Sequence, residues 1–121
     1  MKRKKILIVD DEEKIRANYC RLLQAAGKTL FDVFEASNVI EAAKILTYEE
    51  IDLVLLDIRM PGVDGRKLYE MICAARPETK VIVASVYTID KQKEMIPEAR
   101  DYYDKSQGPI GLLEKVTKCV S

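Results

Sequence analysis

Short apolar runs alternate along the chain with segments in which apolar residues recur every three or four positions. Four runs are continuous, at residues 5–9, 31–34, 53–56 and 81–84, and a weaker fifth covers residues 101–104. The runs are rich in Val, Ile and Leu and do not alternate regularly with polar residues. They therefore predict strands that are covered on both faces, as in a parallel sheet.

The segments between these runs have helical spacing. Helices are predicted over residues 15–26, stopped by Gly27; 38–46, capped by Asn38 with Glu41; 64–75, capped by Asp64; 90–99, broken late by Pro97; and 109–120, opened by Pro109. A strand followed by a helix, repeated five times, predicts a five-stranded parallel sheet with right-handed crossovers and helices on both faces. The predicted fold class is therefore α/β, in three layers.

Length and composition indicate one packed domain. At 121 residues, of which 48% are hydrophobic and 33% charged, the chain can bury one core but not two independent ones. No linker or repeat divides it, so residues 1–121 are expected to form a single domain, with no output domain in this chain. Basic and acidic residues each number 20, and this zero net charge argues against direct contact with nucleic acid or an anionic membrane.

No targeting segment is visible. The apolar run at residues 6–9, after a basic lead-in at 2–5, is far shorter than a signal-peptide core or the ~20 residues that span a bilayer. Cys20, Cys73 and Cys119 are odd in number and widely separated, and the chain has no His, so neither a disulfide framework nor a zinc site is expected. These features predict a cytoplasmic protein with reduced thiols.

Polar residues follow four of the predicted strands. Asp10 and Asp11 follow the first strand, Asp57 the third, Ser85 the fourth and Lys105 the fifth. In open parallel sheets, ligands bind at the carboxyl ends of the strands, near the point where the strand order reverses. We therefore expect three carboxylates, one hydroxyl and one ammonium to converge on one edge of the sheet.

This combination of groups predicts phosphoryl chemistry. Clustered carboxylates raise one another's pKa unless a cation lies among them, and a hard divalent ion such as Mg²⁺ suits them. Asp10 or Asp11 with Asp57, plus a backbone carbonyl just beyond Asp57, would supply its ligands. Lys105 and the Ser85 hydroxyl could then hold phosphoryl oxygens while Asp57, as nucleophile, forms an acyl phosphate. Each residue alone has an ordinary explanation, such as an acidic helix N-terminus or a solvated lysine.

Four segments together resemble the receiver domain of two-component response regulators. They are residues 6–12 (ILIVDDE), 53–65 (LVLLDIRMPGVDG), 81–85 (VIVAS) and 102–105 (YYDK). The resemblance covers nearly the whole chain, and the second segment is highly specific for this family. The resemblance implies a flavodoxin-like (βα)₅ sandwich.

The resemblance also implies the site. Asp57 would be the phosphoacceptor and Lys105 would contact the phosphoryl group. Asp10, Asp11, Asp57 and the backbone carbonyl of Arg59 would bind Mg²⁺, with Mn²⁺ as an alternative ion.

A switch and a set of partners follow from the same resemblance. Ser85 matches the switch hydroxyl, and Tyr102 matches the aromatic residue that moves inward on activation. The phosphoryl donor would be a histidine kinase or a histidine phosphotransfer protein, and the target an output protein or a fused effector domain, with homodimerisation on activation as an option. Such a domain is not an enzyme, since it catalyses only its own phosphorylation and autodephosphorylation.

Several positions depart from the family pattern. Val86 stands where a very small residue usually follows the switch hydroxyl, and Ser106 replaces a proline whose peptide bond is typically cis. A cis bond before a non-proline residue costs ~3 kcal/mol, so a trans, displaced loop is expected. Pro97 predicts a remodelled fourth helix. Arg59, Val86 and Tyr87 flank the approach of water, which predicts slow loss of the phosphoryl group.

Three alternatives differ in function. A haloacid-dehalogenase-like phosphatase generally needs a second acid two residues after its nucleophile, where this chain has Arg59. A flavin or nucleotide binder needs a phosphate-cradling loop after the first strand, where this chain has four acids. The third alternative is a receiver-like interaction module whose phosphorylation is vestigial.

Overall fold

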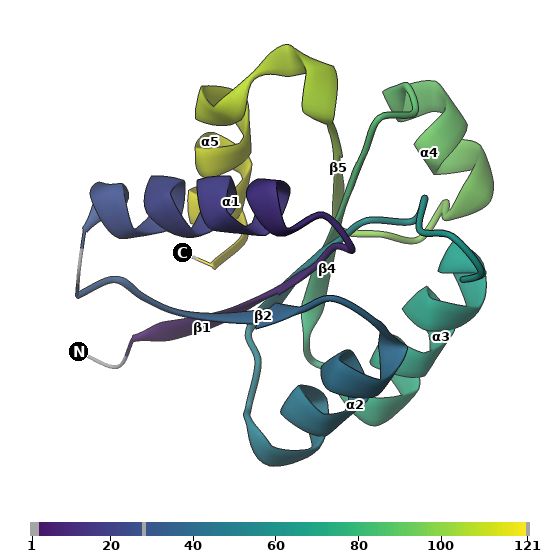
Figure 1. Ribbon diagram of the computed structural model, residues 1–121, viewed down its shortest axis with the longest axis horizontal. Coiled ribbons are helices and arrows are strands. Elements are labelled where there is room, and N and C mark those ends of the chain that lie inside the picture. Colours follow the sequence, from purple (N-terminus) through teal and green to yellow (C-terminus); the bar gives the residue numbers. More distant parts are fainter. Residues whose placement is uncertain (1–2, 28, 121) are drawn as a thin grey trace.

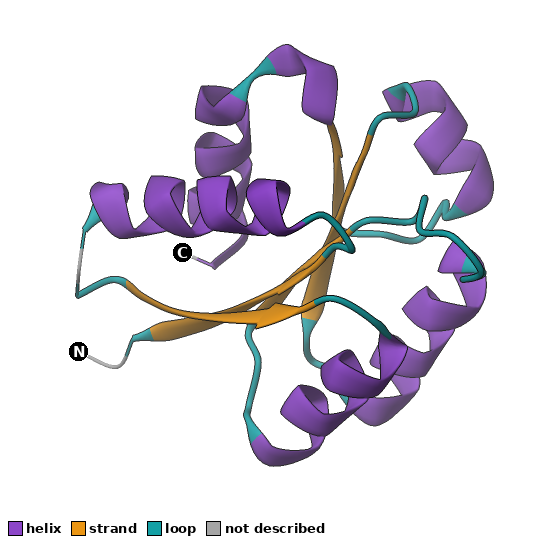
Figure 2. Ribbon diagram, viewed as in Figure 1, coloured by secondary structure: helices purple, strands orange, loops and turns teal. Residues whose placement is uncertain are grey.

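Within the described residues, five strands alternate with five α-helices (Figures 1 and 2). The computed structural model describes residues 3–27 and 29–120, so Lys2 of the basic lead-in lies outside them. The strands are β1 (Lys4–Val9), β2 (Phe31–Ala36), β3 (Leu53–Leu56), β4 (Lys80–Ser85) and β5 (Asp101–Asp104). The helices are α1 (Glu13–Ala26), α2 (Val39–Tyr48), α3 (Gly65–Ala75), α4 (Ile89–Met95) and α5 (Pro109–Val120), and a 3₁₀ turn, η1 (Lys105–Gln107), follows β5.

The strands form one sheet in the order β2-β1-β3-β4-β5, and every pairing is parallel. Figure 1 shows α1 and α5 on one face, with α2, α3 and α4 on the other. Chain order reverses direction across the sheet between β1 and β3, which are neighbours. The predicted three-layer α/β fold is therefore confirmed, including the weak fifth strand.

The residues of β1 explain why its apolar run does not alternate. Leu7 and Val9 belong to the core beneath α2, α3 and α4, whereas Ile6 and Ile8 belong to the core beneath α1 and α5. All four side chains are fully buried. Because helices cover both faces, each successive position is apolar, and the strand ends abruptly at the first carboxylate.

Local hydrogen bonds fix the helix ends where the sequence placed them. The Asn38 side chain accepts a hydrogen bond from the Glu41 backbone N–H at 2.9 Å, and Asp64 accepts one from the Arg66 N–H at 3.0 Å. Gly27 ends α1 with a φ of 156°, a backbone conformation that favours glycine. These predicted caps are confirmed.

The fourth helix is shorter than predicted. The expected range of 90–99 is wrong at its C-terminal end, because α4 stops at Met95. Pro97 has no N–H to donate, and it disfavours helical geometry in the residue before it. Accordingly, the backbone of Ile96 is not helical, with φ −138° and ψ 82°. A loop over residues 96–100 replaces the last turn.

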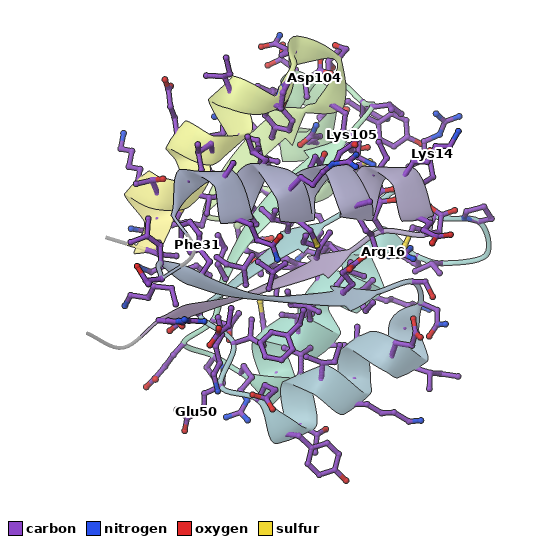
Figure 3. All side chains as sticks on the ribbon, turned by 60° about the vertical axis from the view of Figure 1, so that its left-hand side comes forward. Lys14, Arg16, Phe31, Glu50, Asp104 and Lys105 are labelled. Atoms are coloured by element: carbon purple, nitrogen blue, oxygen red, sulfur yellow. The ribbon has the colours of Figure 1, made fainter. Side chains whose placement is uncertain are left out.

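The strands all begin at one end of the sheet and finish at the other. Figure 3 shows Phe31 and Glu50 at one end and Arg16 and Lys105 at the other, where the strands finish. No helix of the described residues is both long and apolar enough to cross a membrane. Cys20, Cys73 and Cys119 form no disulfide among the described residues.

Candidate functional site

Asp10 and Asp57 lie side by side because the strands that deliver them are neighbours. The Asp57 backbone N–H donates to the Val9 carbonyl at 2.9 Å, which extends the ladder between β1 and β3 by one residue. Both carboxylates are almost fully buried, at 1% and 4% exposure. A buried carboxylate needs a cation or hydrogen-bond donors to offset its lost hydration.

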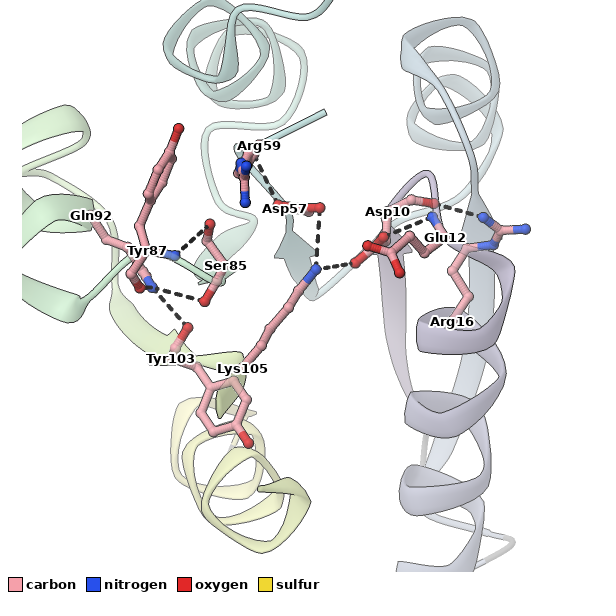
Figure 4. A network of polar contacts seen from close by, with 10 residues as sticks. All are labelled: Asp10, Glu12, Arg16, Asp57, Arg59, Ser85, Tyr87, Gln92, Tyr103 and Lys105. Atoms are coloured by element: carbon pink, nitrogen blue, oxygen red, sulfur yellow. Dashed lines mark hydrogen bonds and ion pairs between the residues drawn. The ribbon is translucent and has the colours of Figure 1, made fainter. Parts of the chain in front are cut away.

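Lys105 supplies that cation from the end of β5. Its Nζ lies 2.6 Å from Asp10 Oδ2 and 3.2 Å from Asp57 Oδ2 (Figure 4). The Lys105 side chain is itself only 9% exposed. The structure thus brings together Asp10, Asp57 and Lys105 from three strands, as the strand-end argument predicted.

The electrostatics of this trio follow from burial and pairing. Desolvation raises the pKa of Asp57, while the Arg59 backbone N–H, at 2.9 Å from Oδ1, and the charge of Lys105 act to lower it. Burial alone would lower the pKa of Lys105, but its hydrogen bond to Asp10 and the charges of Asp57 and Asp10 outweigh that effect and raise it. The Lys105 ammonium therefore stays charged between two carboxylates. Burial makes Asp57 easier to protonate than an aspartate in water.

An open pocket of about 360 Å³ gives solvent access to Asp57 and Lys105. Its lining residues are Asp11, Glu12, Asp57, Arg59, Met60, Pro61, Val86 and Lys105. Two of the predicted shielding residues form its wall: Val86 is 51% exposed, and the Arg59 guanidinium lies over the Tyr87 ring at 5.7 Å from the centroid. The pocket is large enough to receive a phosphoryl group.

The acidic side chains suit a hard divalent cation. Carboxylate oxygens of Asp10, Asp11 and Glu12 lie within 4.8 Å of one another. Asp57 is not part of that group of three, and it connects to Asp10 through the Lys105 ammonium. Because such oxygens are the ligands that Mg²⁺ and Ca²⁺ prefer, the donor set fits the ion that the sequence predicted.

Ser85 and Tyr102 lie away from the pocket lining. Ser85 is fully buried, and its Oγ accepts a hydrogen bond from the Tyr87 backbone N–H at 3.3 Å. The family resemblance implies that Tyr102 moves inward on activation, yet here the ring is already buried at 7% exposure. Its hydroxyl donates to the Ile96 carbonyl at 2.5 Å. An inward swing from an exposed position is thus not available to this conformation.

The loop after β5 accommodates Ser106 without a cis bond. All peptide bonds among the described residues, including Lys105–Ser106, are trans. The Asp104 carboxylate accepts hydrogen bonds from the Ser106 N–H at 2.9 Å and from its hydroxyl at 2.7 Å, and so caps η1. Lys105 still reaches both carboxylates, so the trans loop does not draw it out of the site.

Two polar residues near the site were not identified from the sequence. Arg16 on α1 donates to the Asp10 backbone carbonyl at 2.7 Å and pairs with Glu35 at 3.2 Å (Figure 4). Gln92 on α4 is fully buried and donates to three backbone carbonyls. Gln92 lies between two lysines in a polar stretch, so nothing in the sequence signals its burial.

The fold and site together define a flavodoxin-like α/β protein with an acidic, lysine-bridged site at the point where the strand order reverses. The chain belongs to the response regulator receiver domain family, whose model matches residues 6–117. The predicted family is therefore confirmed, and the chain is a receiver domain of the kind used in two-component signalling.

Known proteins and solved structures are similar to this chain over most of its length. Sporulation initiation phosphotransferase F of Bacillus subtilis is 35% identical over 101 residues, which are 84% of this chain and 77% of that protein. The chain spans only 10% to 54% of several other curated relatives. The response regulator TrrA of Thermotoga maritima, solved in complex with Mg²⁺-BeF, has a TM-score of 0.83 and 34% identity, covering 96% of this chain and 98% of TrrA. A complex of the histidine kinase ThkA with TrrA gives a TM-score of 0.84 and 35% identity, covering 98% of this chain and 99% of the matched one.

Proposed function

We propose that this receiver domain takes a phosphoryl group onto Asp57 from the phosphohistidine of a kinase or of a phosphotransfer protein. The observation that carries this proposal is the Lys105 ammonium held between Asp10 and Asp57 at the floor of an open pocket. The Asp57 carboxylate lines the open pocket, and the Lys105 ammonium lies next to it. The backbone N–H of Arg59 donates a hydrogen bond that orients this carboxylate. These are the parts that phosphoryl transfer needs, because catalysis of that reaction is mainly positioning and charge stabilisation.

In the proposed step, an ionised Asp57 oxygen attacks the phosphorus and the P–N bond of the donor breaks. Its electron pair returns to the imidazole nitrogen, which takes up a proton, and an acyl phosphate remains on Asp57. The Arg59 N–H and Lys105 favour the ionised carboxylate that this attack requires, against the effect of burial. Once the phosphoryl group is attached, Lys105 can contact its oxygens, and Ser85 is the proposed switch hydroxyl on the neighbouring strand.

The proposed cofactor is Mg²⁺, bound by the side chains of Asp10, Asp11 and Asp57 and by the backbone carbonyl of Arg59. When bound, the ion supplies positive charge that offsets the phosphoryl oxygens. The Mg²⁺-BeF complex of TrrA supports this choice of ion. Arg16 contributes indirectly, because its bond to the Asp10 carbonyl holds the loop that carries the acidic pair.

A second hollow gives the donor protein a place to dock. It measures about 430 Å³, lies between α1 and the start of α5, and includes Ile15, Leu22, Tyr103 and Pro109. Lys105 borders both this hollow and the acidic pocket. A donor seated there would lie next to Lys105, which contacts Asp57, and the complex of ThkA with TrrA supports a histidine kinase as that donor.

The remaining assignments extend the same proposal. The domain acts as a single unit over residues 1–121 in the cytoplasm, where its three unpaired thiols are stable. It consumes one phosphoryl group per cycle and has no separate substrate, so it is not an enzyme in the ordinary sense. Its output is a protein contact, either with a separate partner, with a fused effector domain or in a homodimer.

Intact-mass measurement tests the acceptor. With Mg²⁺ and acetyl phosphate or phosphoramidate, the wild type should gain one phosphoryl mass and Asp57→Asn should not. Asp90→Asn is the matched control, since Asp90 is an exposed aspartate on α4, and it should be phosphorylated as the wild type is. Equal uptake by Asp57→Asn would rule out Asp57 as the acceptor. A wild type that takes up no phosphoryl group would favour a vestigial interaction module instead.

A turnover assay separates the receiver from an aspartyl phosphatase. The receiver should not release p-nitrophenol continuously from p-nitrophenyl phosphate, because Arg59 stands where the phosphatase has its second acid. Sustained release that Asp57→Asn abolishes would establish the phosphatase.

A further inference from the structure

The most constrained polar side chain outside the site is that of Gln92. It is fully buried in the middle of α4, a helix of seven residues. Its Nε2 lies 2.8 Å from the Tyr87 carbonyl, 2.9 Å from the Tyr103 carbonyl and 3.4 Å from the Ser85 carbonyl (Figure 4). One amide group therefore connects the end of β4, the loop that follows it, and β5.

The three carbonyls belong to the segments that frame the site. Ser85 carries the proposed switch hydroxyl, and Tyr103 precedes Lys105 by two residues. The β4–β5 ladder ends at the pair of Ser85 with Asp104, after which the loop leaves the sheet. The amide of Gln92 therefore links that loop to β5 at the point where backbone pairing stops.

The helix that carries Gln92 is also attached to β5 through the next side chains. The Lys93 ammonium lies over the Tyr102 ring at 5.8 Å from its centroid, and the Tyr102 hydroxyl donates to the Ile96 carbonyl at the C-terminal end of α4. A displacement of Gln92 would therefore be transmitted along α4 to Tyr102.

The Gln92 amide does not use its full hydrogen-bonding capacity. An amide NH₂ has two hydrogens but faces three carbonyls, and the Gln92 Oε1 is buried with no hydrogen-bond partner among the described residues. A buried carbonyl oxygen without a donor costs free energy. The amide therefore holds three carbonyls while its own oxygen stays unsatisfied, so a rearrangement that gave Oε1 a donor would recover free energy.

The geometry points to Gln92 as a positioning residue that couples the Ser85–Tyr87 loop to α4. This inference rests on the proposed function, in which a phosphoryl group on Asp57 attracts the Ser85 hydroxyl. Movement of Ser85 shifts the carbonyls of Ser85 and Tyr87, both of which Gln92 holds, so α4 must follow or the amide must release them. Gln92 thereby converts a local change at the site into displacement of a helix, by biasing two packings of one element.

The test uses the ¹⁵N-labelled full chain and beryllofluoride with Mg²⁺ as the probe. In the wild type, the probe should shift the amide signal of Arg59 at the site and those of Ile89–Met95 in α4. In Gln92→Met, which keeps the length of the side chain without its hydrogen bonds, the Arg59 shift should remain while the α4 shifts fall at least twofold. Gln24→Met, at an exposed position of α1, is the matched control and should respond as the wild type does.

A second measurement needs no variant. The side-chain NH₂ signals of Gln92 in the wild type should exchange slowly with solvent and should shift when the probe binds. Unchanged NH₂ signals would overturn the inference even if Gln92→Met failed to fold.

The outcomes separate the two proposals. Wild-type shifts at Arg59 without shifts in α4, or α4 shifts of equal size in Gln92→Met, would overturn the coupling and leave the proposed function intact. No response at Arg59 in the wild type would overturn the proposed function and the coupling with it. A purely structural role of Gln92 would lower stability in Gln92→Met but leave the α4 response unchanged.

Discussion

Gly65 lies where the first turn of α3 meets the loop that carries the phosphoacceptor. A Cβ added at Gly65 would lie 2.6 Å from Ile58 Cβ, 2.8 Å from the Ile58 carbonyl oxygen and 2.9 Å from Ile58 Cα. Ordinary contact begins at 3.4 Å, so the two segments would have to separate by roughly 0.8 Å. Two of the three close atoms are backbone, which cannot rotate away.

We expect Gly65→Ala to lower the free energy of unfolding by about 2 kcal/mol, the usual cost of forcing an extra methyl into a packed site. In a domain of this size, that corresponds to a fall in Tm of roughly 6–10 °C. Gly111 is the matched control, because a Cβ there would meet only Tyr103 Cε1 at an ordinary 3.7 Å. Gly111→Ala, within α5, should raise stability by about 0.5–1 kcal/mol through helix propensity.

The same displacement should impair phosphorylation, because Ile58 lies between Asp57 and Arg59. A shift of its backbone disturbs the 2.9 Å hydrogen bond from the Arg59 N–H to Asp57. A misplacement approaching 1 Å can cost about 100-fold in rate, so a loss of at least tenfold in initial phosphorylation rate is expected for folded Gly65→Ala.

The chain has no Trp, so urea unfolding is best followed by far-ultraviolet circular dichroism, and phosphorylation by intact mass. Equal stability of Gly65→Ala and Gly111→Ala would refute the steric argument. Normal phosphorylation by a clearly destabilised Gly65→Ala would refute the link from Ile58 to the site.

Three further predictions concern charge and access at the site. Mg²⁺ at roughly ten times its dissociation constant should stabilise the wild type by about 1.4 kcal/mol and Asp57→Asn by less than half of that, as measured by thermal unfolding; equal effects would exclude Asp57 as a ligand. Lys105→Met should bind Mg²⁺ at least about fivefold more tightly in an NMR titration, a difference of about 1 kcal/mol or more in binding free energy. The reason is that an ammonium 2.6 Å from Asp10 no longer competes with the ion, and an unchanged affinity would contradict this. Once loaded and freed of donor, the wild type should lose its phosphoryl group about tenfold more slowly than Arg59→Asn or Val86→Ala, because both side chains line the approach of water; equal rates would disprove shielding.

Most of the fold could be predicted from the sequence, because its signals are local. A strand covered on both faces must be apolar at every position, so the runs of β1 and β3 could be recognised without knowing their neighbours. The caps at Asn38 and Asp64 depend on side chains within three residues of the helix start. The convergence of Asp10, Asp57 and Lys105 could be predicted as well, because parallel strands finish at one edge of a sheet.

Only the tertiary structure decided how those side chains meet. Lys105 is 95 residues from Asp10 in the sequence. Sequence spacing therefore does not predict that its ammonium contacts the carboxylates of both Asp10 and Asp57. The Tyr102 ring is buried, and its hydroxyl donates to the carbonyl of Ile96, the residue directly after the end of α4 at Met95. Gln92 is buried, and carbonyls from three separate segments offset the cost of burying its amide. Periodicity and caps reflect neighbours along the chain, whereas hydrogen bonding and burial at a site depend on residues that are distant in sequence and are brought together only by packing.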